Sequence, residues 1–321
     1  MSALGRRPVR VAVIGVGSLG QHHARIYAAL EEARLLAVVD SDPGRASIVA
    51  ARHGVPALAS HRDLPRDLDA VSVAVPTSAH AAVVAACLER GLAVLVEKPM
   101  AATLSEASAM QETARRAGKL LCVGHTERFN PIVRAARGRV RDPRFIEAHR
   151  LGVFTARSTD VDVVLDLMIH DLDIILSLVP ARIASIDSVG VHALTDKVDI
   201  ANARIRFEND CVANITASRI STERVRKLRV FESDSYLSID YARQDAVIYS
   251  LRRTAGSAPE IVREPIVAEN EEPLAAELRA FLRRVRGEEV PVVTAEEGLR
   301  ALETALGIVE QIAAARGPSG A

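Results

Sequence analysis

The sequence predicts an α/β protein with a doubly wound parallel sheet at its N-terminus and a C-terminal α/β domain with a large open, mostly antiparallel sheet. Three observations lead to this prediction. Short apolar runs alternate with amphipathic segments up to about residue 124. From residue 183 onward, strand-like segments follow one another with short connections. The chain has 321 residues, which is enough for two domains, and we expect these at residues 1–124 and 125–321.

In the first domain the expected strands are almost wholly apolar, which is typical of a parallel sheet covered by helices on both faces. They are expected at residues 9–14, 35–39, 70–75, 92–96 and 120–123. Helices are expected from the glycine turn to about residue 32 and at residues 43–53, 78–90 and 103–117. Pro43 fits a first helical turn, Thr103 and Glu106 form a capping-box pattern, and Gly91 and Gly118 follow the last turns.

In the second domain strands dominate. They are expected at residues 145–153, 183–194, 201–207, 212–218, 227–231, 236–240 and 246–250, with helices at 130–139, 161–179, 273–286 and 295–315. Asn209-Asp210 marks a hairpin turn. Helix 161–179 or another subunit has to cover the open face of this sheet. Because segment 212–218 is less polar than a solvated face requires, we expect a homodimer or homotetramer formed through the C-terminal sheet.

A glycine-rich turn separates the first strand from the first helix. It reads Gly15-Val16-Gly17-Ser18-Leu19-Gly20, and Asp40 ends the next strand. In a Rossmann fold the three glycines permit a tight turn, close approach of a pyrophosphate and close packing of the helix, whose N-terminus favours phosphate. Since strand, helix and acid are all in place, the motif predicts a dinucleotide cofactor. We assign Gly15, Gly17, Ser18, Leu19, Gly20 and Asp40 to its binding.

Asp40 also bears on the identity of the cofactor. A carboxylate at this position accepts the ribose hydroxyls and repels the 2′-phosphate of NADP, so NAD is expected. Arg45 lies close enough in sequence to weaken the preference for NAD over NADP. Two other classes share the turn and stay open at this point: a methyltransferase, and a non-catalytic NAD-binding regulator.

Glu97-Lys98-Pro99 follows the strand at residues 92–96. Ligands of open parallel sheets bind beyond the carboxyl ends of the strands, so Lys98 is expected near a nicotinamide. Pro99 restricts Lys98 to extended backbone conformations. The alternative is a surface charge at a strand end.

A second group of polar residues lies in the apolar helix at residues 161–179. Asp166 and His170 are four residues apart and share a helix face, and Asp173 follows three residues later. Charged groups on so apolar a helix need a partner or a function. A histidine can accept a proton near neutral pH. The alternative is a core histidine paired with Asp166 or Asp173.

Two further sets lie near the same edge of the parallel sheet. Arg128 comes just past the last strand, where its guanidinium could contact a cofactor phosphate or substrate hydroxyls, and we assign it to the cofactor site. The alternative for Arg128 is an interdomain salt bridge. For His22, His23 and His80, capping and packing are favoured over ligand contact.

Composition excludes several function classes. The 41 basic and 41 acidic residues balance, and no long basic run indicates nucleic-acid binding. No apolar stretch is long enough to span a bilayer, and no signal peptide is recognised. Cys87, Cys122 and Cys211 are far apart in sequence, which favours reduced thiols in the cytoplasm. No His/Cys cluster has zinc-ligand spacing, so no metal is expected.

Four motifs occur in the order found in the Gfo/Idh/MocA oxidoreductase family: Gly15-x-Gly17-x-x-Gly20, Pro76-Thr77-x-x-His80, Glu97-Lys98-Pro99 and Asp166-x-x-x-His170. The chain resembles this family over nearly its whole length. The resemblance implies a Rossmann domain followed by an α/β domain with an open sheet, an NAD or NADP cofactor, and sugar or cyclitol substrates. It implies catalytic roles for Lys98, Asp166 and His170, and a cofactor site that includes Pro76, Thr77, His80, Glu97 and Lys98.

Within the family, the stretches at residues 124–131 and 164–174 look most like the branch of UDP-N-acetylglucosamine 3-dehydrogenases. Many members have a glycine-rich run before the aspartate, whereas this chain has Val161-Asp162-Val163-Val164-Leu165. The implied reaction is oxidation of a secondary alcohol between the nicotinamide and the second-domain sheet. His170 would accept the hydroxyl proton, Lys98 would hydrogen-bond the same oxygen, and Asp166 would orient His170 or the substrate. An inositol or free-sugar dehydrogenase is the alternative.

Overall fold

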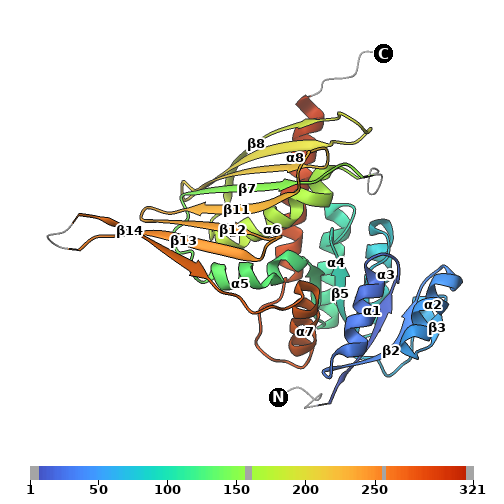
Figure 1. Cartoon of the computed structure of the whole chain (residues 1–321). Coiled ribbons are helices and arrows are strands. Elements are labelled where there is room, and N and C mark those ends of the chain that lie inside the picture. The colour runs from blue at the N-terminus through green and yellow to red at the C-terminus, as the bar shows by residue number, and fades with distance from the viewer. Residues whose placement is uncertain (1–6, 156–160, 255–257, 316–321) are drawn as a thin grey trace, which may run out of the picture. The chain divides into compact units, whose positions relative to one another are not determined.

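The computed structural model describes residues 7–155, 161–254 and 258–315 (Figure 1). The chain forms two compact units. The first contains Met1–Thr126 and Glu272–Arg300, and the second contains Glu127–Glu271 and Ala301–Ala321. The division expected from the sequence placed everything from residue 125 onward in the second domain. The structure differs because Glu272–Arg300 returns to the first unit.

The first unit is built on a six-stranded parallel sheet in the order β3-β2-β1-β4-β5-β6. Its strands are β1 Val9–Ile14, β2 Ala33–Val39, β3 Ala57–Leu58, β4 Ala70–Val73, β5 Ala93–Glu97 and β6 Leu121–Gly124. Its helices are α1 Gly20–Ala29, α2 Pro43–His53, α3 Thr77–Glu89, α4 Leu104–Ala117 and α7 Pro273–Val285, with a 3₁₀ turn η1 at His61–Asp63. This strand order is that of a Rossmann fold and confirms the predicted parallel sheet.

Helix α7 explains why the chain returns to this unit. One face of α7 is strongly apolar, and Leu274, Leu278 and Phe281 join the core formed by β1 and α1, which includes Tyr27. The backbone N–H of Val123 in β6 also donates to the carbonyl of Val293 at 3.0 Å, so the segment after α7 extends the edge of the sheet. A sequence read in order gives no sign of this return, because α7 follows a run of second-unit strands.

The second unit contains an eight-stranded sheet in the order β14-β13-β12-β11-β7-β10-β9-β8. The strands are β7 Phe145–Leu151, β8 Ile183–Val191, β9 Ile200–Phe207, β10 Val212–Ser218, β11 Val225–Phe231, β12 Ser235–Asp240, β13 Asp245–Arg252 and β14 Glu260–Ile266. Only the central β7–β10 pairing is parallel among the pairings of these strands. The mostly antiparallel sheet that the sequence predicts is therefore confirmed.

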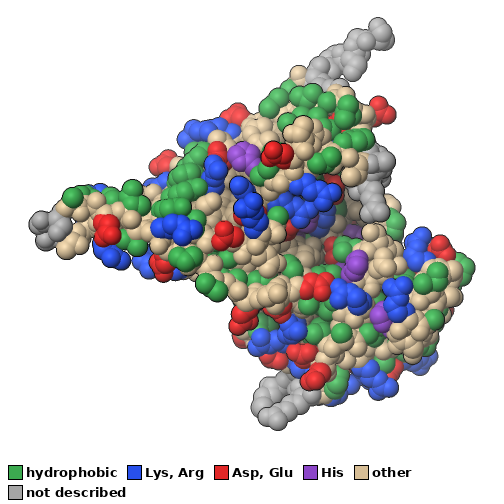
Figure 2. All heavy atoms as spheres, in the orientation of Figure 1, with side chains coloured by type: hydrophobic (Ala, Val, Ile, Leu, Met, Phe, Trp, Pro, Cys, Tyr) green, Lys and Arg blue, Asp and Glu red, His purple; other side chains and the backbone are tan. Residues whose placement is uncertain are grey.

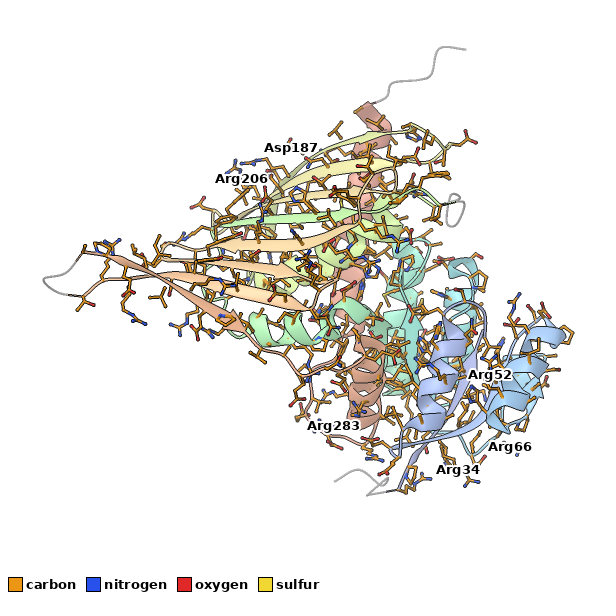
Figure 3. All side chains as sticks on the ribbon, in the orientation of Figure 1. Arg34, Arg52, Arg66, Asp187, Arg206 and Arg283 are labelled. Atoms are coloured by element: carbon orange, nitrogen blue, oxygen red, sulfur yellow. The ribbon has the colours of Figure 1, made fainter. Side chains whose placement is uncertain are left out.

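Helices pack on one face of this sheet, as the green and red helices of Figure 1 show. They are α5 Pro131–Arg137, α6 Ile169–Leu178 and α8 Ala295–Ala315, the last of which belongs to this unit from Ala301 on. The buried core between helices and sheet includes Ile146, Leu172, Ile205 and Leu228. The opposite face carries charged residues such as Asp187 on β8 and Arg206 on β9, which are labelled in Figure 3.

Two features of the second unit were not expected from the sequence. The start of the expected helix 161–179 is a π-helix, η3 Val164–Met168, which leads into α6. The edge strand β14 was missed because its sequence is polar and contains Pro265. Such residues are typical of edge strands, where they oppose further strand pairing.

The charge balance of the sequence is visible at the surface. Acidic and basic side chains are interspersed over the face shown in Figure 2. Of the helices in the described ranges, none combines the length and the apolar character needed to cross a bilayer.

Candidate functional site

The glycine turn has the geometry that its sequence predicts. Gly15 has a φ of +83°, and a Cβ atom there would lie 2.6 Å from the carbonyl oxygen of Ala74. A Cβ atom at Gly20 would collide with the carbonyl oxygen of Gly15. In the described part of the chain no side chain caps α1 at Leu19. The turn is therefore tight, and the N-terminus of α1 offers its dipole and N–H groups to a ligand.

Asp40 connects the glycine turn to the start of α2. Its carboxylate accepts hydrogen bonds from the backbone N–H groups of Val16 and Asp42, both at 2.9 Å. The residue is 6% exposed. Arg45 lies with Nη1 at 3.4 Å from both carboxylate oxygens. Asp40 therefore supports the turn itself, in addition to any contact with a ribose.

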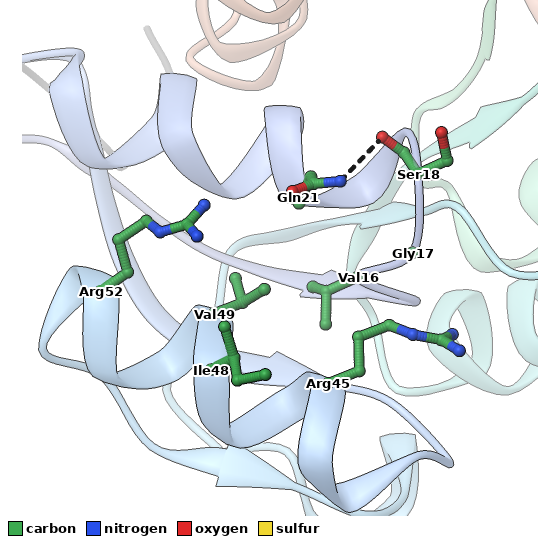
Figure 4. A pocket seen from close by; sticks show the side chains of 8 residues that line it. All are labelled: Val16, Gly17, Ser18, Gln21, Arg45, Ile48, Val49 and Arg52. Atoms are coloured by element: carbon green, nitrogen blue, oxygen red, sulfur yellow. Dashed lines mark hydrogen bonds between the residues drawn. The ribbon is translucent and has the colours of Figure 1, made fainter.

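A cavity of about 420 Å³ opens beside this turn (Figure 4). It is lined by Val16, Gly17, Ser18, Gln21, Arg45, Ile48, Val49 and Arg52. Ile48 and Val49 supply an apolar wall, while Arg45 and Arg52 supply positive charge from α2. Backbone amides for phosphates, an acid for ribose and an apolar wall for a base are what a dinucleotide needs. The residues present fit such a cofactor.

Glu97 supports the turn that contains Lys98. The Glu97 carboxylate is 3.0 Å from Nε2 of His23 and accepts the backbone N–H of Lys98 at 3.3 Å. A Cβ atom at Gly124 would lie 2.8 Å from Oε1 of Glu97, so the neighbouring strand leaves room for this carboxylate. Glu97 is buried, and Lys98 is half-buried next to a cis peptide bond with Pro99. Glu97 therefore supports this turn, and its place in the cofactor site stays a prediction.

His80 connects two loops at the same edge of the sheet. Its Nδ1 is 3.0 Å from the carbonyl oxygen of Pro99, and its Nε2 is 3.0 Å from that of Val75. Burial lowers the pKa of His80, although its contacts with backbone groups oppose this effect. The ring therefore joins the end of β4 to the turn after β5. Pro76 and Thr77 stand between these contacts, at the start of α3.

Asp166 and His170 lie at the junction of η3 and α6. Asp166 is in the π-helix and His170 is in the first turn of the α-helix, and both side chains are half-buried. A π-helical turn widens the backbone, and such turns are frequent at functional sites. The structure keeps the two residues about one helical turn apart in one unit, while Lys98 belongs to the other unit.

Arg128 forms a buried ion pair with Asp173, and its assignment to the cofactor site stays a prediction. Its Nε and Nη2 donate to the two carboxylate oxygens of Asp173 at 2.8 and 2.5 Å. Arg128 is 8% exposed and Asp173 is 1% exposed. Both belong to the second unit, so this is an ion pair within one unit. The bidentate geometry engages Nε and Nη2 of the guanidinium and fixes its orientation.

A second buried arginine, Arg150, was missed from the sequence. It donates from Nε to Asp171 at 2.7 Å and from Nη1 to Glu127 at 3.2 Å, and its guanidinium carbon lies 5.4 Å from the centre of the Tyr241 ring. Burial opposes the charge of Arg150, yet Asp171 and Glu127 raise its pKa above the ordinary value. The sequence contains a pattern that could have identified it. Residues alternate between the two faces of β7, and Arg150 occupies a core-facing position of this strand.

Comparisons with known proteins agree with these features. Residues 9–125 match the family model "Oxidoreductase family, NAD-binding Rossmann fold", and residues 132–237 match "GFO/IDH/MocA C-terminal domain". The UDP-N-acetylglucosamine 3-dehydrogenase of Acidithiobacillus ferrooxidans is 39% identical over 302 residues, which cover 93% of this chain and 95% of that protein. The scyllo-inositol 2-dehydrogenase (NAD(+)) of Bacillus subtilis is 28% identical over an alignment of 317 residues, and the match covers 89% of this chain and 89% of that protein.

The structural comparison leads to the same group. A solved structure of UDP-N-acetylglucosamine 3-dehydrogenase from Acidithiobacillus ferrooxidans matches with a TM-score of 0.88 and 38% identity, covering 96% of this chain and 98% of that one. The resemblance that the four motifs suggest is confirmed. With both domain models matched in order and a 39% identical relative along its length, the chain belongs to the Gfo/Idh/MocA oxidoreductase family, whose N-terminal domain is an NAD-binding Rossmann fold.

Proposed function

We propose that this oxidoreductase uses NAD to oxidise a secondary alcohol of a nucleotide sugar, and that its substrate is the 3-hydroxyl of UDP-N-acetylglucosamine. The observation that carries the proposal is the 39% identity to a UDP-N-acetylglucosamine 3-dehydrogenase over 93% of this chain. The glycine turn, Asp40 and the adjacent cavity support the cofactor assignment. Arg45 and Arg52 in that cavity leave NADP as a second cofactor to test.

Three residues of this chain carry the proposed chemistry. The oxidised nicotinamide supplies a hydride acceptor when it is bound. His170 accepts the proton of the substrate hydroxyl as general base. Lys98 donates a hydrogen bond to the same oxygen and stabilises the negative charge that develops on it. Asp166, about one turn before His170, orients the imidazole or the substrate.

The alternative substrates are inositols and free sugars. The 28% identity to scyllo-inositol 2-dehydrogenase favours them as the second candidate. The decisive experiment incubates the purified protein with UDP-N-acetylglucosamine, other nucleotide sugars, free sugars and inositols, each with NAD or NADP, and follows absorbance of the reduced nicotinamide. Preferred turnover of an inositol would replace the nucleotide sugar. Cofactor binding without turnover of any of these alcohols would instead favour a non-catalytic NAD-binding regulator.

We also propose that the protein is a homodimer or homotetramer formed through the sheet of the second unit. On the face opposite the helices, Phe145, Phe231, Tyr236 and Tyr249 form a continuous row, with successive ring centroids 5.7, 4.7 and 5.7 Å apart. Two of the six Phe and two of the four Tyr of the chain lie in this row. Aromatic residues of this kind are enriched in protein interfaces.

We also propose a cytoplasmic location, and the cysteines support it. Cys87, Cys122 and Cys211 are buried thiols. Burial raises the pKa of Cys87 and of Cys211 to about 11, which keeps both protonated at neutral pH. Such cysteines are typical of proteins from reducing compartments.

A further inference from the structure

Two buried ion pairs hold the helix that carries His170. Arg128 contacts Asp173 through Nε and Nη2 at 2.8 and 2.5 Å, and Arg150 contacts Asp171 through Nε and Nη2 at 2.7 and 3.1 Å. All four residues are at most 8% exposed. Bidentate contacts between a guanidinium and a carboxylate fix orientation as well as distance. Each pair therefore restrains α6 in a defined position.

The two carboxylates flank His170 on α6. A helix advances by about 100° per residue, so Asp171 lies about 100° to one side of His170, and Asp173 lies about 60° to the other side. Apolar side chains such as Ile169 and Leu172 already pack α6 in the core. Two bidentate contacts on opposite sides of His170 further restrict rotation of the helix in both directions.

Both ion pairs of α6 are connected to the same short segment of the chain. Glu127 and Arg128 are neighbours in η2 Thr126–Phe129. Arg128 binds Asp173 directly, while Glu127 accepts from Nη1 of Arg150 at 3.2 Å, and Arg150 in turn binds Asp171. Arg150 belongs to the central strand β7. The start of α6 is thus tied both to η2 and to the middle of the sheet.

We propose that Arg128, Asp173, Arg150 and Asp171 are positioning residues, which set the rotation of α6 and thereby the direction of the His170 imidazole. The proposal rests on the proposed role of His170 as general base. Buried ion pairs are often no more stabilising than apolar residues of similar size. Stability alone therefore does not account for two such pairs beside one histidine, whereas precise orientation does.

The experiment replaces an ion pair by apolar residues so that the fold is retained. Arg128→Met combined with Asp173→Leu removes both charges together, which avoids leaving one buried charge without its counter-charge. The matched control applies the same changes, Arg139→Met and Glu264→Leu, to a pair in the same unit whose side chains are 41% and 53% exposed. Melting temperature, NADH affinity, kcat with UDP-N-acetylglucosamine and the pH profile of kcat are measured for both variants.

We expect the Arg128/Asp173 variant to melt near wild type and to bind NADH normally. Its kcat should fall roughly 10- to 100-fold, because small misplacement of a catalytic group has effects of this size. The acidic limb of its pH profile should move, whereas the control should match wild type.

Combination with His170→Gln distinguishes the positioning proposal from the proposed function. If the ion pair acts through His170, adding its exchange to His170→Gln lowers kcat no further. A folded exchange variant with wild-type kcat and pH profile would overturn positioning and leave the role of His170 intact. Normal turnover by His170→Gln itself would contradict the role of His170 as general base. It would also contradict the positioning proposal, which depends on that role.

Discussion

At the scale of single residues, Asp40 has two roles that involve the same carboxylate. It supports the glycine turn through Val16 and Asp42, and it is the proposed acceptor for the ribose of NAD. We expect Asp40→Ala to weaken NADH binding by roughly 10- to 100-fold, since hydrogen bonds to a charged group contribute about 1.5–3 kcal/mol. NADPH binding should weaken less, because the change also removes a charge that repels the 2′-phosphate.

The measurement is titration of both reduced cofactors by nicotinamide fluorescence. Asp42→Ala is the control, because Asp42 caps α2 through its contact with the N–H of Arg45 at 3.0 Å and lies outside the predicted ribose site. A wild-type protein that already prefers NADPH would contradict the assignment of Asp40.

His170 and Lys98 give the second prediction at this scale. His170→Gln should lower kcat by about 10²–10⁴, the usual contribution of a general base. It should also remove the acidic limb of the kcat profile while leaving NADH binding nearly intact. Lys98→Met should lower kcat strongly as well, and the two losses should not add, because both residues act on one oxygen and one proton.

Melting temperature, NADH binding and kcat are measured on the same preparations. A structural histidine gives the opposite pattern, in which His170→Gln lowers the melting temperature and the folded enzyme turns over normally. In that case Lys98 would become the leading candidate for the proton acceptor.

Single-residue chemistry could be predicted where it depends on local sequence. The roles of Gly15 and Gly20 follow from the turn itself, and the geometry agrees with them. The partner of Arg128 could not be predicted, because Asp173 lies 45 residues away in sequence. The sequence places both groups near the site, but only the fold shows that they satisfy each other.

At the scale of elements, the π-helical start of the His170 segment is the main departure from prediction. Its apolar pattern fits a continuous helix, and hydrophobic periodicity does not distinguish a widened turn from a regular one. Asp162 accepts the N–H of Val198 at 2.9 Å, which connects this turn to the segment before β9. That segment also contains Asp199, whose contacts lead to a prediction about acid stability.

Asp199 organises the connection between β8 and β9. Its carboxylate accepts the backbone N–H groups of Ala193, Leu194 and Thr195 at 2.9, 2.7 and 2.9 Å. Burial alone raises the pKa of this group, but these hydrogen bonds outweigh it and lower the pKa from 3.8 to about 2. Because the folded pKa is depressed, the stabilisation is complete above about pH 4 and is lost as pH falls toward 2.

We therefore expect the free energy of unfolding to decrease by about 2 kcal/mol between pH 4 and pH 2 through Asp199. Asp199→Asn should lower stability at neutral pH. It should also make the free energy of unfolding depend less on pH between pH 4 and pH 2. Urea unfolding across the acid range measures the effect, with Asp187→Asn on the exposed face of β8 as control. If the free energy of unfolding of Asp199→Asn falls with decreasing pH as steeply as that of wild type, this carboxylate does not govern the loop.

At the scale of the whole molecule, both sheets could be predicted because composition and connections differ between them. Nearly continuous apolar strands that alternate with helices indicated a parallel sheet, and successive short strands with short connections indicated an antiparallel one. The parallel pairing of β7 with β10 and the return of Glu272–Arg300 to the first unit could not be predicted. Both features depend on contacts between segments that are far apart in sequence, and local sequence patterns do not specify such contacts.

The sheet of the second unit leads to the last prediction, which concerns assembly. Phe231 occupies the middle of the aromatic row and stacks on Tyr236 with ring centroids 4.7 Å apart. If this face joins two copies, Phe231→Glu places a charge in a desolvated interface. The dissociation constant should rise roughly 30-fold or more, because a central interface aromatic contributes about 2 kcal/mol or more.

Light scattering after size exclusion, repeated over a dilution series, gives the mass in multiples of 34.5 kDa. The control is Val267→Glu, which adds the same charge at a side chain that is 86% exposed and lies just after β14. We expect the control to keep the mass of the wild-type assembly at concentrations where Phe231→Glu dissociates. A wild-type protein that stays monomeric at micromolar concentration would rule out the interface, and an oligomer that survives Phe231→Glu would place it on another surface.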